Sequence, residues 1–594
     1  MPTTFLNALF DGSTNVNTLN GTQSWFDRFL GYYSQYEENA NNNLVANVTL
    51  TGANWTVATM RFGDASEQSQ LNLIDANGFA NRTIQYLQLG HNSDVDLTST
   101  RVWYMIGFEG DLHDITLGSG RVNSIDLYAD RNVVTTGSGT VGHIDTDNGT
   151  GIFNVNGFVG RIDASDANDI LRVFNTGEVD SAYLRGGNDT VLVNGSGRIS
   201  NLTIFGGNNT VTVRDQGIID ELRLGSGDNT VRNVSGDARI RYVKFTEGDN
   251  TLFTAGYMET FNSWQSNNTI QINGGAGSLT FNSETQLNHV VTATSYVESL
   301  RVNDRGNDPN DDQTTRLTFT DGGGAGSIYL GSGNDRVVTD GYVDYLNTSR
   351  GNDIITIGSG GMGHLSMGDG NDLARFGGFD NTGNGVVIWG GAGIDTIDFA
   401  RVPSIGVTFS LDVAGQWQNV GAPGGGLDET PAVGWVSVSG IENVVGTLRR
   451  DHLTGNRNNN DLNGRGGLDT IHGGEGDDIL RGQFGGDELY GESGSDTIFG
   501  GVGTDTIVGG ADNDNLSGAE DADIFVFGAN SGFDQIRDFE DGTDIIRIAD
   551  HAGGFGTLSI FDRGDNLRVD HDGGQILLIG YAGTVLTAAD FDFV

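Results

Sequence analysis

Acidic or amide side chains recur every nine residues between positions 451 and 523, and each stands five residues after a glycine. An apolar residue follows each of them two positions later. Carboxylates in glycine-rich loops offer oxygen ligands from side chains and from backbone carbonyls, which is the donor set that Ca²⁺ prefers. The spacing therefore predicts an array of calcium sites. The aspartates predicted as ligands are Asp451, Asp469, Asp478, Asp487, Asp496, Asp505, Asp514 and Asp523, with Asn460 interrupting the series.

Short strands must position these side chains. Nine residues suffice for half a coil of a parallel β-roll, with the apolar residue pointing inward and the glycines turning the chain. Residues 18 apart then stack, which predicts two columns, one from Asp451 through Asp469 and one from Asn460 through Asp478. We expect the strongest sites between Asp469 and Asp514. The loop glycines expected to contribute carbonyl ligands are Gly467, Gly476, Gly485, Gly494 and Gly503.

The composition excludes several other kinds of site. The 594 residues contain no cysteine, and the nine histidines form no clustered pair, which disfavours zinc and rules out disulfides. The net charge of −46 and pI of about 4.2 disfavour nucleic acid and anionic membranes as partners. No apolar run is long enough to predict a transmembrane helix, and the N-terminus lacks the pattern of a cleaved signal peptide.

A second, longer period precedes the nine-residue repeat. Asn148, Asn168, Asn188, Asn208 and Asp228 are evenly spaced at intervals of twenty, and most of them open a short apolar strand. Two strands and two tight loops in about 20 residues are typical of one coil of a parallel β-solenoid. The recurring polar residues either form a ladder that satisfies loop amides or are ordinary loop residues exposed to water. GSGND at Gly331 and GDGND at Gly368 approach the nine-residue pattern and suggest isolated calcium ions there.

These patterns predict an all-β chain: a right-handed parallel β-solenoid continuing into a calcium-binding β-roll. The segment TQSWFDRFLGYYSQYEE, residues 22–38, has the apolar clustering of an amphipathic helix and predicts a helical cap or an anchor. The predicted parts are residues 1–45 for this cap, 46–400 for the solenoid, 401–445 for a connecting β segment, 446–527 for the roll, and 528–594 for a C-terminal cap with a secretion signal.

The stretch from Gly390 to Asp550 resembles RTX proteins. The resemblance rests on G-G-x-G-x-D-x-U-x repeats (U, a large apolar residue), on GGAGIDTIDFA at Gly390, and on ADIFVFGANSGFDQIRDFEDGTDIIRI, which is similar to the C-terminal module of serralysin-type proteins. It implies several bound Ca²⁺ ions, export by a type I secretion machinery through the tail TVLTAADFDFV at Thr584, and an extracellular or cell-surface location. It also suggests a further calcium ligand among Asp534, Asp538, Asp541 and Asp544, although ordinary cap loops are the simpler interpretation.

No catalytic motif accompanies these repeats. H-E-x-x-H, G-x-S-x-G and a cysteine nucleophile are all absent, so we expect no enzyme. The leading hypothesis is a structural surface-layer or matrix protein that self-assembles on binding Ca²⁺, similar to RTX surface-layer proteins, with other copies of itself and cell-surface polysaccharide as partners. The alternatives are an adhesin that binds carbohydrate and a polysaccharide lyase, hydrolase or epimerase with its site on the solenoid.

Overall fold

The computed structural model describes residues 92–594 apart from short gaps at 284–287, 305–313, 321, 379–384, 403–405, 422–433 and 550–552. Before residue 92 it describes the strands β1 to β7. The chain forms two compact units, Met1–Val297 and Glu298–Val594. Apart from the short 3-10 helices η1 (Phe555–Thr557) and η2 (Ala588–Asp590), the described residues of both units contain strands and loops only, which confirms the all-β prediction.

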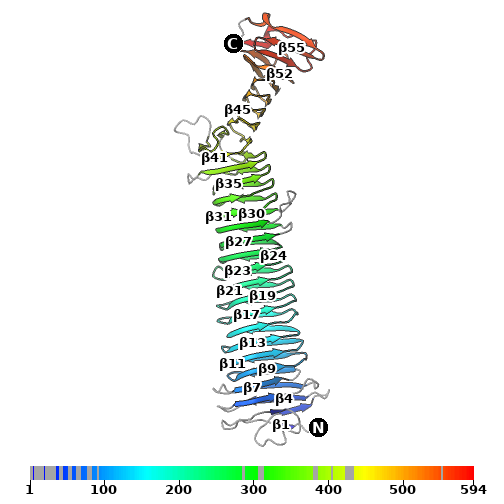
Figure 1. Cartoon of the computed structure of the whole chain (residues 1–594), viewed down its shortest axis with the longest axis vertical. Coiled ribbons are helices and arrows are strands. Elements are labelled where there is room, and N and C mark those ends of the chain that lie inside the picture. Colours follow the sequence, from blue (N-terminus) through cyan, green and yellow to red (C-terminus); the bar gives the residue numbers. More distant parts are fainter. Residues whose placement is uncertain are drawn as a thin grey trace. The chain divides into compact units, whose positions relative to one another are not determined.

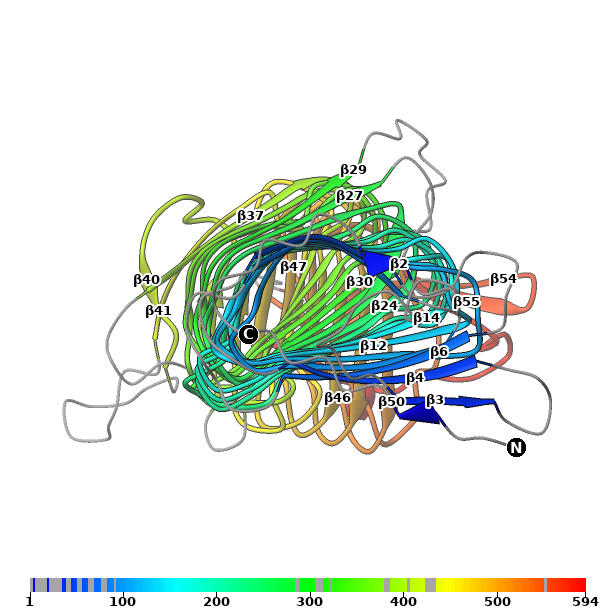
Figure 2. The same cartoon turned by 90° about the horizontal axis from the view of Figure 1, so that it is seen from below.

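The first unit is a parallel β-solenoid in which each coil contributes one strand to each of two sheets (Figures 1 and 2). One sheet contains β4 (Leu44–Leu50), β6 (Ser69–Asp75), β8 (Asn92–Leu97), β10 (His113–Leu117), β12 (Arg131–Thr136), β14 (Thr150–Val155), β16 (Ile170–Val173), β18 (Thr190–Val193), β20 (Thr210–Val213), β22 (Thr230–Asn233), β24 (Gly248–Thr254), β26 (Ser266–Ile272) and β28 (His289–Ala293). The other contains β2 (Leu19–Asn20), β5 (Thr56–Arg61), β7 (Thr83–Leu89), β9 (Arg101–Gly107), β11 (Arg121–Leu127), β13 (Thr140–Thr146), β15 (Phe158–Asp163), β17 (Glu178–Leu184), β19 (Arg198–Ile204), β21 (Ile218–Leu224), β23 (Arg239–Phe245), β25 (Met258–Trp264) and β27 (Ala276–Ser283).

The register confirms the predicted coil length. Ser181 pairs with Arg161 on one side and with Asn201 on the other. Alternate residues of each strand point inward, so that β20, with the sequence Thr-Val-Thr-Val, buries both of its valines completely. Each such side chain contributes roughly 1.5–3 kcal/mol through removal of apolar surface from water. The buried side chains of successive coils together form the core, and this core holds the loops in place.

The polar residues at this regular spacing form a ladder on the outside of the loops. The side-chain oxygen of Asn168 accepts a hydrogen bond of 2.6 Å from the backbone N–H of Asn188, and Asn188 accepts one of 2.7 Å from Asn208. Asn208 in turn accepts from Asp228 at 2.8 Å. Asn168, Asn188 and Asn208 are nevertheless exposed to water. Both interpretations offered by the sequence therefore hold: these are exposed loop residues, and they satisfy loop amides.

The second unit contains further solenoid coils and then a narrower roll. Its coils are built from β29 (Val297–Asp304, which begins at the last residue of the first unit), β30 (Thr315–Phe319), β31 (Ala325–Tyr329), β32 (Arg336–Thr339), β33 (Val343–Asn347), β34 (Ile354–Ile357), β35 (Met362–Asp369), β36 (Leu373–Phe376), β37 (Val386–Ala392), β38 (Thr396–Asp398), β41 (Trp435–Ser439) and β42 (Asn443–Val445). The short strand β40 (Gln418–Asn419) pairs antiparallel with β41. Residues 401–445 contain the change of sheet: β39 (Thr408–Ser410) pairs with β43 (His452–Thr454) and opens a new sheet, while β42 extends the old one to β44 (Asp461–Asn463).

The roll alternates between these two sheets every nine residues. One sheet contains β43 (His452–Thr454), β45 (Thr470–Glu475), β47 (Glu488–Ser493), β49 (Thr506–Ala511), β51 (Ile524–Phe527), β53 (Ile545–Ile548) and β57 (Phe591–Phe593). The other contains β44 (Asp461–Asn463), β46 (Ile479–Phe484), β48 (Thr497–Val502), β50 (Asn515–Glu520) and β52 (Gly532–Ile536). Antiparallel strands β54 (Ser559–Arg563), β55 (Asn566–His571) and β56 (Gly574–Leu578) follow, and β56 pairs with β52. The tail thus folds back as β57 beside β53.

The predicted N-terminal helix is wrong over its last residues. Gln35–Glu38 forms strand β3, which pairs antiparallel with β4 and with β1 (Thr4–Phe5). Pairing of its backbone with the first solenoid strand outweighs the weak helical preference of so short a segment. The remainder of the predicted helix, residues 22–34, lies outside the described residues.

Candidate calcium sites in the roll

The aspartates of the nine-residue repeat stack in two columns, as the spacing predicts. The backbone N–H of Asp469 donates to Oδ1 of Asp487 at 2.7 Å, and Asp487 donates in the same way to Asp505 at 2.7 Å. In the other column Asp478 donates to Asp496 and Asp496 to Asp514, both at 2.8 Å. One carboxylate oxygen of each residue is therefore held by the preceding coil, and its position is fixed by the stacking of the strands.

The second carboxylate oxygen has no partner. Oδ2 of every one of these aspartates is buried and makes no hydrogen bond, and the residues themselves are at most 1% exposed. They are Asp469, Asp478, Asp487, Asp496, Asp505, Asp514 and Asp523. A buried, unpaired carboxylate oxygen is costly, so each of these atoms requires either a proton or a cation. A bound Ca²⁺ meets this requirement with the ligand type that it prefers.

The glycines at position 1 of the repeat make room for these oxygens. A Cβ atom placed on Gly482 would lie 2.3 Å from Oδ2 of Asp487, and one placed on Gly509 would lie 2.2 Å from Oδ2 of Asp514. The space that any other side chain would fill is the space in which the carboxylate lies. This steric requirement accounts for the unbroken glycine period in the sequence.

The glycines at position 4 bring backbone carbonyls into line. Gly467 and Gly485 have φ values of +139° and +136°, which favour glycine, and their N–H groups donate to the carbonyls of Phe484 and Val502 at 2.8 Å. A Cβ on Gly485 would lie only 1.6 Å from the carbonyl oxygen of Gly467. Gly476, Gly494 and Gly503 also have positive φ values, of +113°, +125° and +128°. The predicted carbonyl donors are thus stacked one coil above another, while their role as calcium ligands stays a prediction.

Burial shifts the proton affinity of the columns. Burial raises the pKa of Asp469 and of Asp514 from 3.8 to about 8, and that of Asp505 to about 7. Neighbouring carboxylates in the same column raise these pKa values further. Near neutral pH and without a cation, the roll must therefore hold protons or bear uncompensated buried charge.

The first residue of each column differs from the rest. Both carboxylate oxygens of Asp451 have donors, since Oδ1 accepts from the N–H of Val407 at 2.7 Å and Oδ2 accepts from that of Thr447 at 2.6 Å. The amide of Asn460 donates to the carbonyl of Glu442 at 2.7 Å. Asp451 and Asn460 are thus satisfied by the protein itself, and Asp451 is the least suited to a cation among the predicted ligands.

Two aspartates beyond the repeat continue the columns. The backbone N–H of Asp514 donates to Oδ1 of Asp534 and that of Asp523 donates to Oδ1 of Asp544, both at 3.0 Å. Oδ2 of Asp534 has no partner, whereas that of Asp544 accepts from the N–H of Glu540 at 2.7 Å. Their spacings of 20 and 21 residues break the nine-residue period, which is why the sequence alone did not place them in the columns. Asp534 has the geometry of a further ligand.

The oxygen atoms available to a cation in the roll are single carboxylates, each surrounded by backbone carbonyls. Within the described part of the chain, no three side chains of His, Asp or Glu converge in the manner of a metal cluster. Any cation in the roll is therefore held by one or two carboxylates together with backbone oxygens. This arrangement suits a hard ion with many oxygen ligands and does not suit zinc.

A second polar site lies on the outer face of the first unit. Oδ2 of Asp163 accepts from Nε of Arg161 at 2.5 Å and contacts Nε2 of His143 at 2.6 Å. Burial raises the pKa of Asp163, but the hydrogen bonds from Arg161 and His143 outweigh it and hold that pKa below its ordinary value. In neighbouring coils, Tyr104 donates to Asp126, and burial together with this bond raises the pKa of Tyr104.

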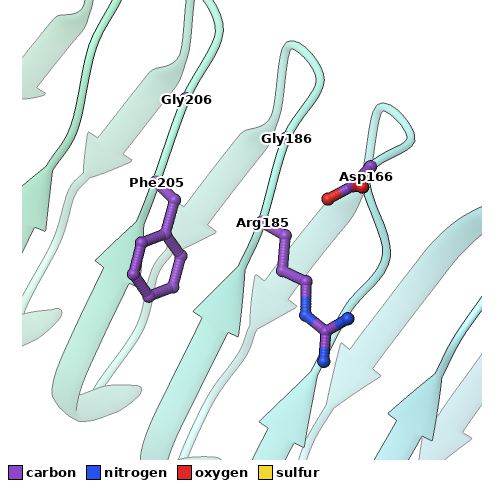
Figure 3. A pocket seen from close by; sticks show the side chains of 5 residues that line it. All are labelled: Asp166, Arg185, Gly186, Phe205 and Gly206. Atoms are coloured by element: carbon purple, nitrogen blue, oxygen red, sulfur yellow. The ribbon is translucent and has the colours of Figure 1, made fainter.

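A shallow pocket of about 440 Å³ lies just beyond these strands, in the loops after β15, β17 and β19 (Figure 3). It is lined by Asp166, Arg185, Gly186, Phe205 and Gly206. The three larger side chains come from three consecutive coils, and Phe205 is 56% exposed. An aromatic face beside a cation and a carboxylate has the chemistry of a saccharide-binding surface.

Comparison with known proteins supports the assignment of the nine-residue repeat. The RTX calcium-binding nonapeptide repeat family matches residues 437–471, 464–498, 472–507 and 499–534. Among solved structures, the extracellular lipase LipA from Serratia marcescens is 15% identical, with 48% of this chain and 45% of the lipase covered. The chain thus spans less than half of the lipase's length, and the TM-score of 0.18 is too low to relate the two folds. No curated protein matches the chain. Among the described residues, no helix is long and apolar enough to cross a membrane.

Proposed function

We propose that this chain is a secreted, calcium-binding structural protein of the cell surface, a component of a surface layer or matrix, which folds and self-assembles on binding extracellular Ca²⁺. The observation that carries the proposal is the repeated buried carboxylate oxygen without a partner, from Asp469 to Asp534. Such a roll is unfavourable where calcium is scarce, as in the cytosol, and favourable where it is plentiful, as outside the cell. Export by a type I secretion machinery, through the tail at residues 584–594, suits a chain that must stay unfolded until it leaves.

Charge links calcium binding to assembly. A net charge of −46 makes copies of the chain repel one another. Each bound Ca²⁺ offsets two negative charges, so filling of the columns reduces the repulsion between neighbouring copies. Polysaccharide of the cell surface is the proposed anchor for the assembled layer.

Electron microscopy and small-angle scattering with and without millimolar Ca²⁺ test this function. We expect dispersed chains in EGTA and ordered sheets or filaments in Ca²⁺. Dispersed monomers in both conditions, with a folded roll in Ca²⁺, would reject self-assembly while leaving calcium binding intact. The variant Asp487→Asn is the matched probe, because it removes one unpartnered carboxylate without changing the size of the side chain.

Saccharide binding by the first unit is the second candidate, and the pocket of Asp166, Arg185 and Phe205 favours it. Phe205 would stack on a sugar ring, while Arg185 and Asp166 would bind its hydroxyl or acidic groups. A glycan array with the full chain tests this proposal, with Phe205→Ala and Arg185→Ala as the probes. Val234→Ala is the control, because Val234 is an exposed apolar residue of the first unit outside this pocket. Equal glycan signals for all four proteins would exclude the pocket.

A polysaccharide-acting enzyme is the third candidate, supported by two polar clusters on neighbouring coils: Tyr104 with Asp126, and His143 and Arg161 with Asp163. Hydrogen-bonded Tyr–Asp and His–Asp pairs are able to move protons at a sugar carbon or a glycosidic oxygen. Release of reducing ends or of unsaturated sugars from acidic and neutral polysaccharides is the assay. Activity lost in His143→Gln and in Tyr104→Phe would support an enzyme, whereas no activity on any polymer would oppose it.

A further inference from the structure

The loops that precede the roll in the second unit have the geometry of the roll's calcium loops. Three successive ones are Thr348–Asp353, Met367–Asp372 and Gly390–Asp395, and each ends on an aspartate immediately before a strand. The loop before them, which contains the GSGND segment at Gly331, is similar: Oδ2 of Asp335 has no hydrogen-bond partner and Gly333 has a φ of +120°. All three lie before residue 437, where the family match begins. Their aspartates are spaced by 19 and 23 residues rather than by the 18 of the roll, so a strict nine-residue period does not detect them.

The aspartates of these loops repeat the ladder of the roll. The N–H of Asp353 donates to Oδ1 of Asp372 at 2.7 Å, and that of Asp372 donates to Oδ1 of Asp395 at 2.9 Å. Asp353, Asp372 and Asp395 are at most 1% exposed, and Oδ2 of each is buried without a hydrogen-bond partner. Each loop thus presents a buried oxygen like those of the roll, although the carboxyl group of Asp353 also has a side-chain hydrogen bond from Thr348.

The backbone of these loops also matches the roll. Gly351, Gly370 and Gly393, at position 4, have φ values of +126°, +141° and +133°, against +139° and +136° for Gly467 and Gly485. The N–H of Gly351 donates to the carbonyl of Asp369 at 2.8 Å, and that of Gly370 donates to the carbonyl of Ala392 at 2.7 Å. These bonds, from position 4 to position 3 of the next coil, are the ones that Gly467 and Gly485 make.

Position 1 distinguishes the three loops. In the last loop it is Gly390, where a Cβ would lie 2.5 Å from Oδ2 of Asp395, as in the roll. In the other two it is Thr348 and Met367, which are both buried. The loop of Asp395 is therefore the closest match, and the loop of Asp372 is its direct neighbour in the stack.

The first unit shows how a loop is satisfied without a cation. In two of its coils the buried residue stacked before the strand is Asn209 or Asn229, and its amide donates to backbone carbonyls of its own loop, at 2.8 Å to Gly207 and to Gly227 respectively. The same stack begins with Asp169 and Asp189, whose Oδ2 atoms are buried without a hydrogen-bond partner. The position-4 glycines Gly207 and Gly227 have φ values of +86° and +110°, against +113° to +139° in the roll. The NH₂ group of an asparagine thus donates hydrogen bonds to the loop carbonyls. An aspartate has no such donor, so its loop requires a cation or a proton at the same place.

We propose that the loops ending at Asp353, Asp372 and Asp395 bind Ca²⁺, as a second calcium segment within the solenoid coils that lie upstream of the roll. The ligands are Oδ2 of these aspartates and backbone carbonyls of the stacked glycine loops. The segment makes the last solenoid coils, as well as the roll, dependent on calcium. Calcium binding by this segment does not depend on the proposed self-assembly, since the ligands lie within one chain.

Terbium luminescence tests the proposal at one site. Tb³⁺ occupies calcium sites and emits when a nearby tryptophan is excited, and Trp389 directly precedes Gly390. Residues 446–594, which contain the whole roll, have no tryptophan, so excitation through tryptophan favours the upstream sites. We expect the full-length chain to emit and Trp389→Phe to lose most of that emission.

The variants Asp395→Asn and Asp372→Asn are expected to lose most of the emission too, because an amide takes the place of the cation as it does at Asn209. Asp369→Asn is the matched control, since it removes an equal charge from an exposed side chain of the same loop. Asp505→Asn, in the roll, is the second control. Both controls should keep the emission.

Wild-type emission in folded Asp395→Asn and Asp372→Asn would overturn the proposal, because Tb³⁺ would then be bound elsewhere on the acidic surface. Native mass spectrometry with Ca²⁺ provides an independent count that does not require tryptophan. Asp353→Asn and Asp372→Asn should each bind about one ion fewer than Asp369→Asn. Equal counts for the three variants would also overturn the proposal, whatever happens to the assembly of the protein.

Discussion

Removal of calcium should make the roll unstable at high pH and more stable in acid. The perturbation is excess EGTA with the full-length chain, at pH 5 and at pH 8. Burial raises the pKa of Asp505 and of Asp523 from 3.8 to about 7. In the unfolded chain each of these groups loses its proton near pH 4, whereas in the folded roll it keeps that proton to about pH 7.

The sign of the pH effect follows from these proton affinities. Below pH 4 both states hold the proton and the group contributes no penalty. Between about pH 4 and pH 7 the unfolded state binds fewer protons, so the free energy of unfolding falls as the pH rises. Above pH 7 the whole penalty is present, about 4 kcal/mol for one such carboxyl. Two of them cost about 8 kcal/mol, which is comparable to the whole stability of a typical domain.

Amide hydrogen exchange over β45 to β50 is the assay, with protection factors corrected for the intrinsic exchange rate at each pH. In EGTA we expect protection at pH 5 and little at pH 8. In millimolar Ca²⁺ we expect protection at pH 8, because the cation replaces the proton. Equal protection at pH 8 with and without calcium would refute the reasoning, since the unpartnered oxygens would then cost nothing.

Three further variants test parts of the same account. Gly482→Ala should weaken calcium binding at least tenfold, because its Cβ would lie 2.3 Å from Oδ2 of Asp487, whereas Gly528→Ala has no atom within 4 Å and should bind normally in the same calorimetric titration. Asn460→Asp should add about one bound Ca²⁺ and lower the stability in EGTA, since it replaces an amide that donates to Glu442 with an unpaired carboxylate; an unchanged ion count by native mass spectrometry would contradict this. Leu480→Ala should destabilise the roll by about 2–5 kcal/mol, because Leu480 is fully buried, and denaturant unfolding in Ca²⁺ measures the change.

Periodicity predicted most of the fold. The glycine at every ninth position and the apolar residue seven positions later sufficed to place the strands of the roll, and stacking at 18 residues sufficed to place Asp469 beside Asp487. The longer period placed the solenoid coils for the same reason, that identical spacing produces identical register. Where the spacing slips, prediction fails: Asp534 and Asp544 join the columns at 20 and 21 residues.

Other features depend on contacts that a pattern of residue types does not contain. Asp451 stands at the same repeat position as the other aspartates, yet both of its oxygens have donors. The N–H of Val407, which is distant in sequence, donates to Oδ1, and Thr447 of its own loop donates to Oδ2. Strand β3 replaces the end of a predicted helix because a neighbouring strand pairs with it. The site of Arg161, His143 and Asp163 joins residues from two coils, and no motif in the sequence predicts it.

The central claim is that the unpartnered oxygens of the roll are calcium ligands. A crystal structure grown with Ca²⁺, with the ions located by their anomalous scattering, tests it most directly. The account predicts a row of ions along each column, with Oδ2 of Asp469 to Asp534 about 2.3–2.6 Å from an ion. Columns without ions, in which each Oδ2 instead shares a proton with a backbone carbonyl, would contradict it.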